Sequence, residues 1–204
     1  MSDLLKQLSD IAMSRDPVPP PGDCQYAACY CEENVYKLTQ KLAVEHPESL
    51  PDTWAVFISN PGRCVPLWSQ KAGREGDGLV VWDYHVILLH RKDDQTRVYD
   101  LDTRLPFPSQ FSHYAETALG SEEDLEPKFH RKFRVVPGAE YLASLSSDRR
   151  HMKDEEGWLQ TPPSWPCIRG KEGADHNLDS FIDMDDAVGA GKVLNFKTFI
   201  EQFS

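Results

Sequence analysis

Two apolar, strand-like segments close together in the sequence constrain the fold most strongly. LVVWDYHVILLH spans residues 79–90, TRVYDLDT spans residues 96–103, and a short polar turn containing Asp93 and Asp94 separates them. Strands joined by so short a loop pair as an antiparallel hairpin. Further strand-like runs lie at residues 53–59, 65–69 and 132–136. The sequence therefore predicts a largely antiparallel sheet.

A helix is predicted to begin at Cys31. Val35, Leu38 and Leu42 recur at helical spacing, and Cys31 lies on the same stripe, four residues before Val35. Pro47 follows the segment EHPES and favours an end to the helix before it. We therefore expect the Cys31 side chain to face inward from the start of this helix.

Other helical patterns lie at both ends of the chain. They are a short amphipathic pattern at residues 1–15, the segment AEYLASL, the short segment NLDSFIDM and a terminal helix with Phe196, Phe199, Ile200 and Phe203 on one side. Helices that flank a run of strands predict the α+β class, which is α/β in the broad sense. We expect one compact domain at residues 23–204, preceded by a variable tail at residues 1–22 that contains the run DPVPPPGD.

Composition excludes several classes of partner. The 204 residues include 22 Lys and Arg against 33 Asp and Glu, a formal net charge of −11, and no basic run is present to bind a phosphate backbone. No apolar stretch approaches a membrane span, and the N-terminus lacks the pattern of a signal peptide. An odd number of cysteines fits reduced thiols better than a disulfide framework. We expect an intracellular protein that binds neither nucleic acid nor membrane.

Two cysteines stand close together in CYCEENVYKL, and only one of them is placed for chemistry. A helix N-terminus stabilises a thiolate, so the position of Cys31 predicts a lowered thiol pKa and a nucleophile. The alternative is an inert buried thiol, because free cysteine is among the most buried residue types. Cys29 is expected to be such a small buried side chain.

The hairpin supplies a histidine and two carboxylates. A turn centred near Asp93 and Asp94 places His85 opposite Asp102 and one diagonal step from Asp100. A carboxylate that holds one ring nitrogen of a histidine forms the base-and-orienter half of a catalytic triad. Register alone leaves the choice between Asp100 and Asp102 open. A slip of one residue would place His85 on the opposite face of the sheet from both aspartates.

A zinc site is the competing use of the cysteines. Cys24, Cys29 and Cys31, with Cys64 or Cys167, offer enough thiols, but their spacing does not match a paired C-x-x-C knuckle. We therefore expect no metal.

Eight segments together resemble one known family. They are CYCEENVYKL, AVFISN, VWDYHVILLH, VYDLDTRLPFP, RKFRVVPGAEYL, SDRRHMKD, PPSWPCI and NLDSFIDMD. In this order they resemble the protein N-terminal glutamine amidohydrolase family, whose members deamidate an N-terminal glutamine to glutamate. The resemblance runs from about Cys24 to the C-terminal helix.

The resemblance implies a site and a role. The family's triad falls on Cys31, His85 and Asp100, which implies Asp100 over Asp102 and Cys31 over Cys29. It implies a fold related to papain and transglutaminase and no cofactor. It further implies substrates with an N-terminal glutamine, and a product glutamate that is arginylated and so directs the protein to degradation in the cytoplasm or nucleus. A monomer is the default expectation.

A site restricted to terminal glutamine needs a group that reads the free α-ammonium. A nearby carboxylate meets that requirement, and Glu32, Glu33 and Asp83 are the candidates by their closeness in sequence to Cys31 and His85. Two other classes of function fit the same residues. One is a related thiol enzyme, a peptidase or transamidase; the other is a catalytically silent module that binds peptide N-termini.

Overall fold

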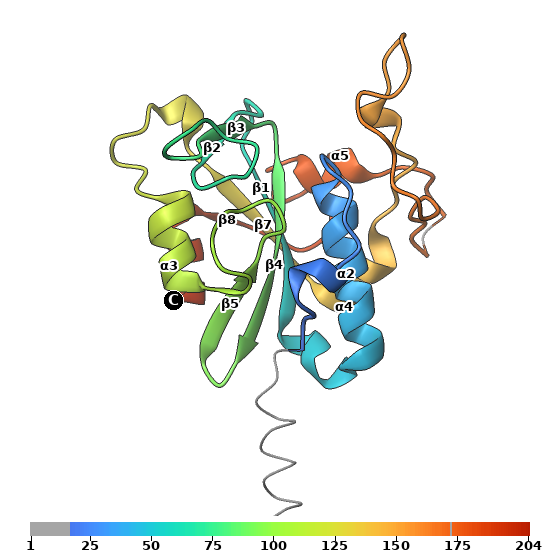
Figure 1. Ribbon diagram of the computed structural model, residues 1–204, viewed down its shortest axis with the longest axis horizontal. Helices are drawn as coiled ribbons and strands as arrows, with labels where there is room; N and C mark the ends of the chain where they lie inside the picture. Colours follow the sequence, from blue (N-terminus) through green and yellow to red (C-terminus); the bar gives the residue numbers. More distant parts are fainter. Residues whose placement is uncertain (1–16, 172) are drawn as a thin grey trace, which may run out of the picture.

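A six-stranded antiparallel sheet forms the centre of the computed structural model, which describes residues 17–171 and 173–204 (Figure 1). The spatial order of its strands is β6-β5-β4-β1-β7-β8. The strands of this sheet are β1 (Thr53–Ser59), β4 (His85–Lys92), β5 (Gln95–Tyr99), β6 (Ser109–Gln110), β7 (Lys132–Pro137) and β8 (Lys192–Asn195). A separate pair consists of β2 (Val65–Leu67) and β3 (Val80–Trp82).

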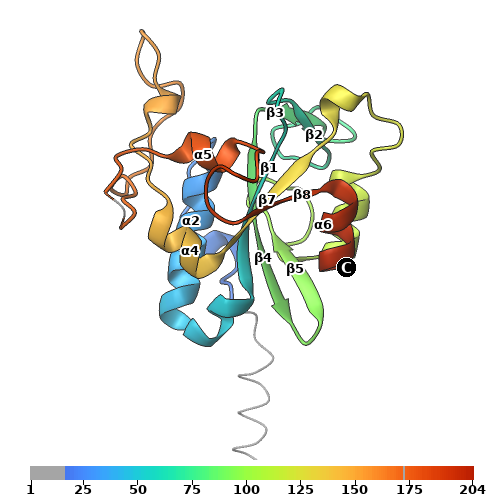
Figure 2. The same ribbon diagram turned by 180° about the vertical axis from the view of Figure 1, so that it is seen from behind.

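Helices cover both faces of the sheet. In Figures 1 and 2, α2, α4 and α5 lie on one side of the sheet and α3 and α6 on the other. The helices are α2 (Cys31–Glu45), α3 (Phe111–Tyr114, continued by a π-helical turn to Leu119), α4 (Gly138–Ser144), α5 (Leu178–Ile182) and α6 (Phe196–Phe203). The predicted single α+β domain, an antiparallel sheet flanked by helices, is confirmed, whereas its relation to papain and transglutaminase stays a prediction.

Two apolar cores follow from the alternation of side chains along the strands. Ala55 and Phe57 of β1 belong to the core under α2, α4 and α5, whereas Val56 and Ile58 belong to the core under α3 and α6. Successive strand residues point to opposite faces, so a central strand covered on both sides must be apolar throughout. In β1 every residue except Trp54 is buried, which explains why this stretch is apolar without a polar face.

The segment predicted as one strand at residues 79–90 is divided in the structure. Residues 80–82 pair with β2, and β4 starts at His85. At the break, the Asp83 side chain accepts a hydrogen bond of 2.9 Å from the Tyr84 amide, and the Asp83 carbonyl accepts one of 2.8 Å from Ser59 Oγ. These local bonds replace the ladder bonds of a continuous strand.

The predicted hairpin register is confirmed, but the pairing is shorter than expected. β4 and β5 pair from Lys92 with Gln95 to Leu88 with Tyr99, and no further. Asp100 ends the strand because its Oδ1 accepts a 2.9 Å hydrogen bond from the Asp102 amide and closes a turn. The edge of β4 next to His85 is therefore left open by β5, although β1 continues to pair with it on the other side.

The predicted tail divides into two parts. The expected helix at residues 1–15 lies outside the described residues. Val18, which falls within the predicted tail, is only 5% exposed and packs in the core under α2. The apolar core therefore includes a residue that precedes position 23. Among the helices that the structure describes, none has the length and apolar character to cross a membrane.

A buried ion pair ties α2 to the segment after α4. Both oxygens of Glu33 accept hydrogen bonds of 2.8 Å from Arg149, and Trp165 Nε1 donates a further bond of 2.7 Å to Oε2. Glu33 is fully buried and Arg149 nearly so. The partners stand 116 and 132 residues away in sequence, so this cluster fixes the long 145–170 segment against the helix that carries Cys31.

Glu33→Gln is expected to lower the free energy of unfolding by about 3 kcal/mol, because it leaves the buried Arg149 without a counter-charge. Chemical denaturation followed by circular dichroism measures the change. Glu45→Gln is the matched control, since Glu45 is an exposed glutamate on the same helix. Equal stability of the two variants would contradict the structural role of Glu33.

Candidate active site

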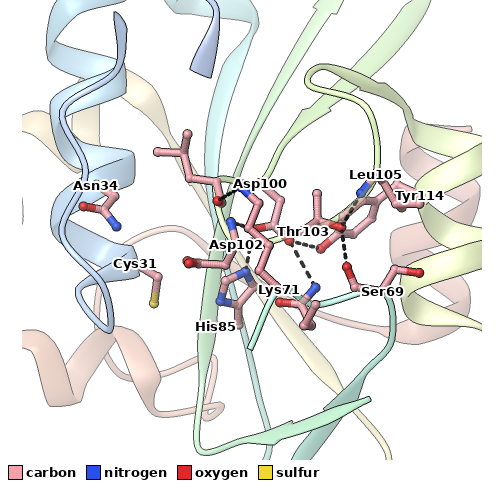
Figure 3. Close-up of polar contacts among 12 residues, drawn as sticks. Cys31, Asn34, Ser69, Lys71, His85, Asp100, Asp102, Thr103, Leu105 and Tyr114 are labelled. Carbon is pink, nitrogen blue, oxygen red and sulfur yellow. Dashed lines mark hydrogen bonds and ion pairs between the residues drawn. The ribbon is translucent and has the colours of Figure 1, made fainter. Parts of the chain in front are cut away.

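Cys31 is the first residue of α2, the helix that packs against β4. The Asn34 side chain exchanges two hydrogen bonds of 2.8 Å with the backbone of Ala27, which fastens the loop that leads into the helix. The backbone N–H of Val86 lies close enough to the Cys31 sulfur to lower the pKa of the thiol. Because Val86 follows His85 on β4, the thiol is held beside the strand that carries the histidine (Figure 3).

His85 and Asp100 form a buried pair. His85 Nε2 lies 3.0 Å from Asp100 Oδ1, and both side chains are almost completely buried. Asp100 Oδ2 also accepts a 2.8 Å hydrogen bond from the Tyr114 hydroxyl and a longer one of 3.4 Å from Gln70 Nε2. These contacts fix the carboxylate, and the carboxylate fixes the imidazole ring.

The other ring nitrogen of His85 is left for a reaction. Nδ1 is buried and has no hydrogen-bond partner within the described residues. Trp82 stacks on the imidazole with ring centroids 5.4 Å apart and planes 18° from parallel, so the ring is held in place on one face. A neutral imidazole that donates Nε2–H to Asp100 presents Nδ1 as a proton acceptor.

Cys31 and His85 line the same cleft, which has a volume of about 320 Å³. Its lining residues are Cys29, Cys31, Arg63, Trp82, Asp83, Tyr84, His85, Asp102, His151, Met152, Leu159, Asp179 and Ile182. A larger cleft of about 760 Å³ lies around Asn60 and Asp185 and contains neither Cys31 nor His85. The smaller cleft is therefore the candidate active site, because it combines a thiol with a positioned imidazole.

Burial and charge act against a thiolate at Cys31. Burial raises the pKa of the Cys31 thiol well above its usual value, and the Glu32 and Asp102 carboxylates raise it further, whereas the Val86 N–H lowers it. The lowered pKa expected from the helix N-terminus is therefore wrong for this structure, because desolvation and neighbouring carboxylates outweigh the helix terminus. Burial and the neighbouring carboxylates therefore favour the neutral thiol form of Cys31.

The pKa values of His85 and Asp100 shift in opposite directions. Burial alone would lower the pKa of His85, but the Asp100 carboxylate outweighs it and raises the pKa above its usual value. Burial alone would raise the pKa of Asp100, but the imidazole, the Asp102 amide and the Tyr114 hydroxyl lower it. Asp100 therefore stays ionised and favours a proton on His85, as an orienting carboxylate must.

The three carboxylates that were predicted to bind the α-ammonium of the substrate lie in different surroundings. Asp83 is exposed and lines the cleft. Glu32 is fully buried below the cleft, where its Oε2 lies 3.9 Å from the Cys31 sulfur and accepts a 2.9 Å bond from the Tyr84 hydroxyl. Glu33 does not line the cleft, and Arg149 and Trp165 occupy its oxygens. The structure therefore gives Glu33 a structural position and not one that faces a ligand.

Cys29 is placed differently from its prediction. It is exposed and lines the cleft rather than lying buried. Its φ of 66° puts it in the left-handed region, where the chain turns sharply into α2 and carries the side chain to the rim. The expectation of a small buried side chain is therefore wrong, because it rested on the usual burial of free cysteines, whereas this turn leaves the Cys29 side chain exposed.

Several residues that contact the site could not be predicted from the sequence. Tyr114 and Gln70 reach Asp100 from distant segments, and Tyr26 donates a 2.6 Å hydrogen bond to Asp102. Nothing in their local sequence distinguishes them from ordinary buried or surface residues. Trp82 was detectable in principle, since it stands three residues before His85 in the motif VWDYH.

One group of side chains has the composition of a metal site. A ring nitrogen of His85 and carboxylate oxygens of Asp100 and Asp102 lie within 4.8 Å of one another. Both Asp100 oxygens already accept hydrogen bonds from protein donors, so the group is organised for a histidine–carboxylate pair rather than for a cation. Within the part of the chain that the structure describes, the cysteines do not join a group of metal-ligating side chains.

Fold and site together define the class: an α+β protein with a thiol, an imidazole and a carboxylate gathered at one cleft beside an antiparallel sheet. The family model described as N-terminal glutamine amidase matches residues 26–203. Proteins named protein N-terminal glutamine amidohydrolase are 48% identical in Bos taurus over 92% of this chain and 91% of the bovine protein, and 46% identical in Homo sapiens over 94% of each. The protein of that name in Drosophila melanogaster is 46% identical over 91% of each chain. The chain belongs to the N-terminal glutamine amidase family.

Iodoacetamide is expected to alkylate Cys31 slowly at neutral pH and faster as the pH rises, with a midpoint above the usual thiol pKa of about 8.5, because burial, Glu32 and Asp102 disfavour the thiolate. Mass spectrometry of the peptide that carries Cys29 and Cys31 measures the rate, and Cys31→Ala identifies the share due to Cys29. The other titratable groups that line the cleft with the thiol are Arg63, Asp83, Tyr84, His85, His151 and Asp179. Rapid alkylation of Cys31 below pH 6 would show a preformed thiolate–imidazolium pair instead.

Proposed function

We propose that the chain is a protein N-terminal glutamine amidohydrolase that converts an N-terminal glutamine to glutamate and releases ammonia. One observation carries the proposal beyond family membership: His85 is bound to Asp100 through Nε2, its Nδ1 has no hydrogen-bond partner among the described residues, and His85 and Cys31 line the same cleft. This is the arrangement of a Cys-His-Asp triad, with Cys31 as nucleophile, His85 as base and Asp100 as orienting group.

The first step is attack on the side-chain amide. Because burial favours the thiol form of Cys31, His85 Nδ1 takes its proton as the sulfur bonds to the carboxamide carbon of the glutamine. Asp100 stabilises the imidazolium that forms. The oxygen of the tetrahedral intermediate carries negative charge, and the free backbone amides at the start of α2 are the donors we assign to it.

The second step releases ammonia and restores the enzyme. His85 returns its proton to the amide nitrogen, the carbon–nitrogen bond breaks, and ammonia leaves a thioester on Cys31. Water then attacks the thioester carbon as His85 accepts a proton from it, and the thiol departs reprotonated. The sum is glutamine plus water to glutamate plus ammonia, with the protein unchanged and without any cofactor.

The resemblance supports a wider role for the reaction. Substrates are proteins and peptides with an N-terminal glutamine, and the product glutamate is a substrate for arginyl transfer, which marks the protein for ubiquitin-dependent degradation. We propose that the chain acts in this pathway as a monomer in the cytoplasm and nucleus.

Incubation with three peptides tests the reaction. The peptide with an N-terminal glutamine is expected to gain about 1 Da and release ammonia, whereas peptides with internal glutamine or N-terminal asparagine stay unchanged, since the site acts on a terminal glutamine. Mass spectrometry and an ammonia assay follow the products, and Cys31→Ala is the inactive control. Backbone cleavage or transfer to an added amine would indicate a peptidase or transamidase. Equal binding of unchanged peptide by wild type and Cys31→Ala would indicate a binding module.

Asp100→Asn is expected to lower kcat by about 10³–10⁴-fold, because the imidazole loses the charge that holds its tautomer and stabilises its protonated form. Asp100 raises the pKa of His85, so its removal also moves the acid limb of the pH–rate profile to lower pH. Steady-state kinetics across pH measures both effects. Asp102→Asn is the matched comparison and should lower kcat less; the reverse ranking would contradict the triad.

A further inference from the structure

The carboxylates of the cleft differ in whether a cation accompanies them. Asp83, Asp102 and Asp179 line the cleft. Asp179 pairs with Arg63 at 2.8 Å. In residues 17–171 and 173–204, neither Asp83 nor Asp102 forms an ion pair with a lysine or arginine, and Lys71, the nearest candidate to Asp102, binds the Leu101 carbonyl instead. Asp83 and Asp102 are therefore cleft carboxylates that no lysine or arginine of the described residues pairs with directly.

Asp102 is the more confined of these two carboxylates. Its side chain is partly buried, and Tyr26 donates a 2.6 Å hydrogen bond to Oδ1. Its backbone amide is bound by Asp100, so its position is fixed relative to the triad. Asp83 is exposed, and one of its oxygens accepts a hydrogen bond from the Tyr84 amide. A carboxylate that is partly withdrawn from water, held in place and without a cation is a strong recognition site for a positive group.

The position of Asp102 matches the dimensions of a terminal glutamine. A carboxylate oxygen of Asp102 lies within 4.8 Å of a ring nitrogen of His85, and Figure 3 shows its carboxylate on the side of the histidine that faces Cys31. In glutamine, four single bonds in staggered rotamers separate the α-nitrogen from the carboxamide carbon by about 4–5 Å. A glutamine whose carboxamide group lies beside the His85 ring therefore has a side chain of the right length to bring its α-ammonium to Asp102.

We propose that Asp102, oriented by Tyr26, binds the α-ammonium of the substrate and restricts the enzyme to N-terminal glutamine. This inference rests on the proposed function and names the specificity-determining group of the same site. The buried Glu32 does not line the cleft, because Tyr84 and His151 lie around its carboxylate. Asp102 takes the role for which the sequence suggested Glu32, Glu33 and Asp83.

Asp102 also links recognition to the nucleophile. Its negative charge is one of the causes that raise the pKa of Cys31. An ammonium bound to Asp102 neutralises that charge and makes removal of the thiol proton easier. A ligand without an α-ammonium leaves the nucleophile suppressed. The same contact therefore favours the correct substrate both in binding and in the chemical step.

Two peptides that differ only at the α-nitrogen test the inference. One begins with glutamine and the other with glutaramoyl, in which hydrogen replaces the α-amino group. Wild type is expected to favour the glutamine peptide roughly 10- to 100-fold in kcat/KM, as for a hydrogen bond between charged groups. In Asp102→Asn this ratio falls towards one, mainly through a higher KM for the glutamine peptide, and the pH midpoint for alkylation of Cys31 moves to lower pH.

Two further variants sharpen the result. Asp83→Asn removes the other cleft carboxylate that lacks a cation and is expected to leave the ratio unchanged. Tyr26→Phe removes only the donor that orients Asp102 from the exposed rim, so it is expected to keep the fold and reduce the ratio partly. It therefore tests the contact independently of any effect of Asp102→Asn on folding.

The outcomes separate this inference from the proposed function. If wild type hydrolyses the glutamine peptide and both Asp102→Asn and Tyr26→Phe keep the full preference, the assignment of Asp102 is overturned and the proposed function stands. A preference that disappears in Asp83→Asn but not in Asp102→Asn also overturns it. If wild type leaves the glutamine peptide unchanged, the proposed function itself fails.

Discussion

The hydrogen bond between the Asp100 carboxylate and the Asp102 amide determines how the rest of the site is arranged. It closes the turn that ends β5 after Tyr99 and leaves part of the β4 edge without a partner on that side. An open edge normally attracts another strand, but here α2 packs against β4 with Cys31 as its first residue, and the Val86 amide acts on the pKa of the Cys31 thiol. The same carboxylate holds His85, so one side chain both makes room for the thiol and positions its base.

Burial of acids is the main electrostatic feature around this arrangement. Glu32 and Glu33 are fully buried in the first turn of α2, and Asp100 is buried across from them. Their partners differ: Glu33 has a guanidinium, Asp100 has several donors, and Glu32 has the Tyr84 hydroxyl on Oε2, whereas its Oε1 lies 3.4 Å from His151 Nε2 without a hydrogen bond among the described residues. Buried charges persist only when they are paired or hydrogen-bonded, so these contacts stiffen the walls of the cleft.

The sequence predicted local structure better than long-range contacts. The helix that begins at Cys31, the register of the β4–β5 hairpin and the antiparallel sheet follow from periodicity and turn residues, which act over a few positions. Spacing alone did not choose between Asp100 and Asp102, since the choice depends on where the strand ends, and the resemblance supplied it. The hydrogen bonds of Glu33 could not be predicted from the sequence, because its partners Arg149 and Trp165 lie more than a hundred residues away. The pKa of Cys31 was predicted in the wrong direction because burial is a property of the whole fold.

The stacking of Trp82 on His85 has a consequence for the order of events. With Nε2 bound to Asp100 and the indole stacked on one ring face, the imidazole is held in one orientation and has a single nitrogen without a partner among the described residues. In the proposed reaction that nitrogen serves first the departing amine and later the incoming water, at the same point in space. Ammonia must therefore vacate the cleft before water can take its place, which makes the exit of a small neutral molecule an obligatory event in every turnover.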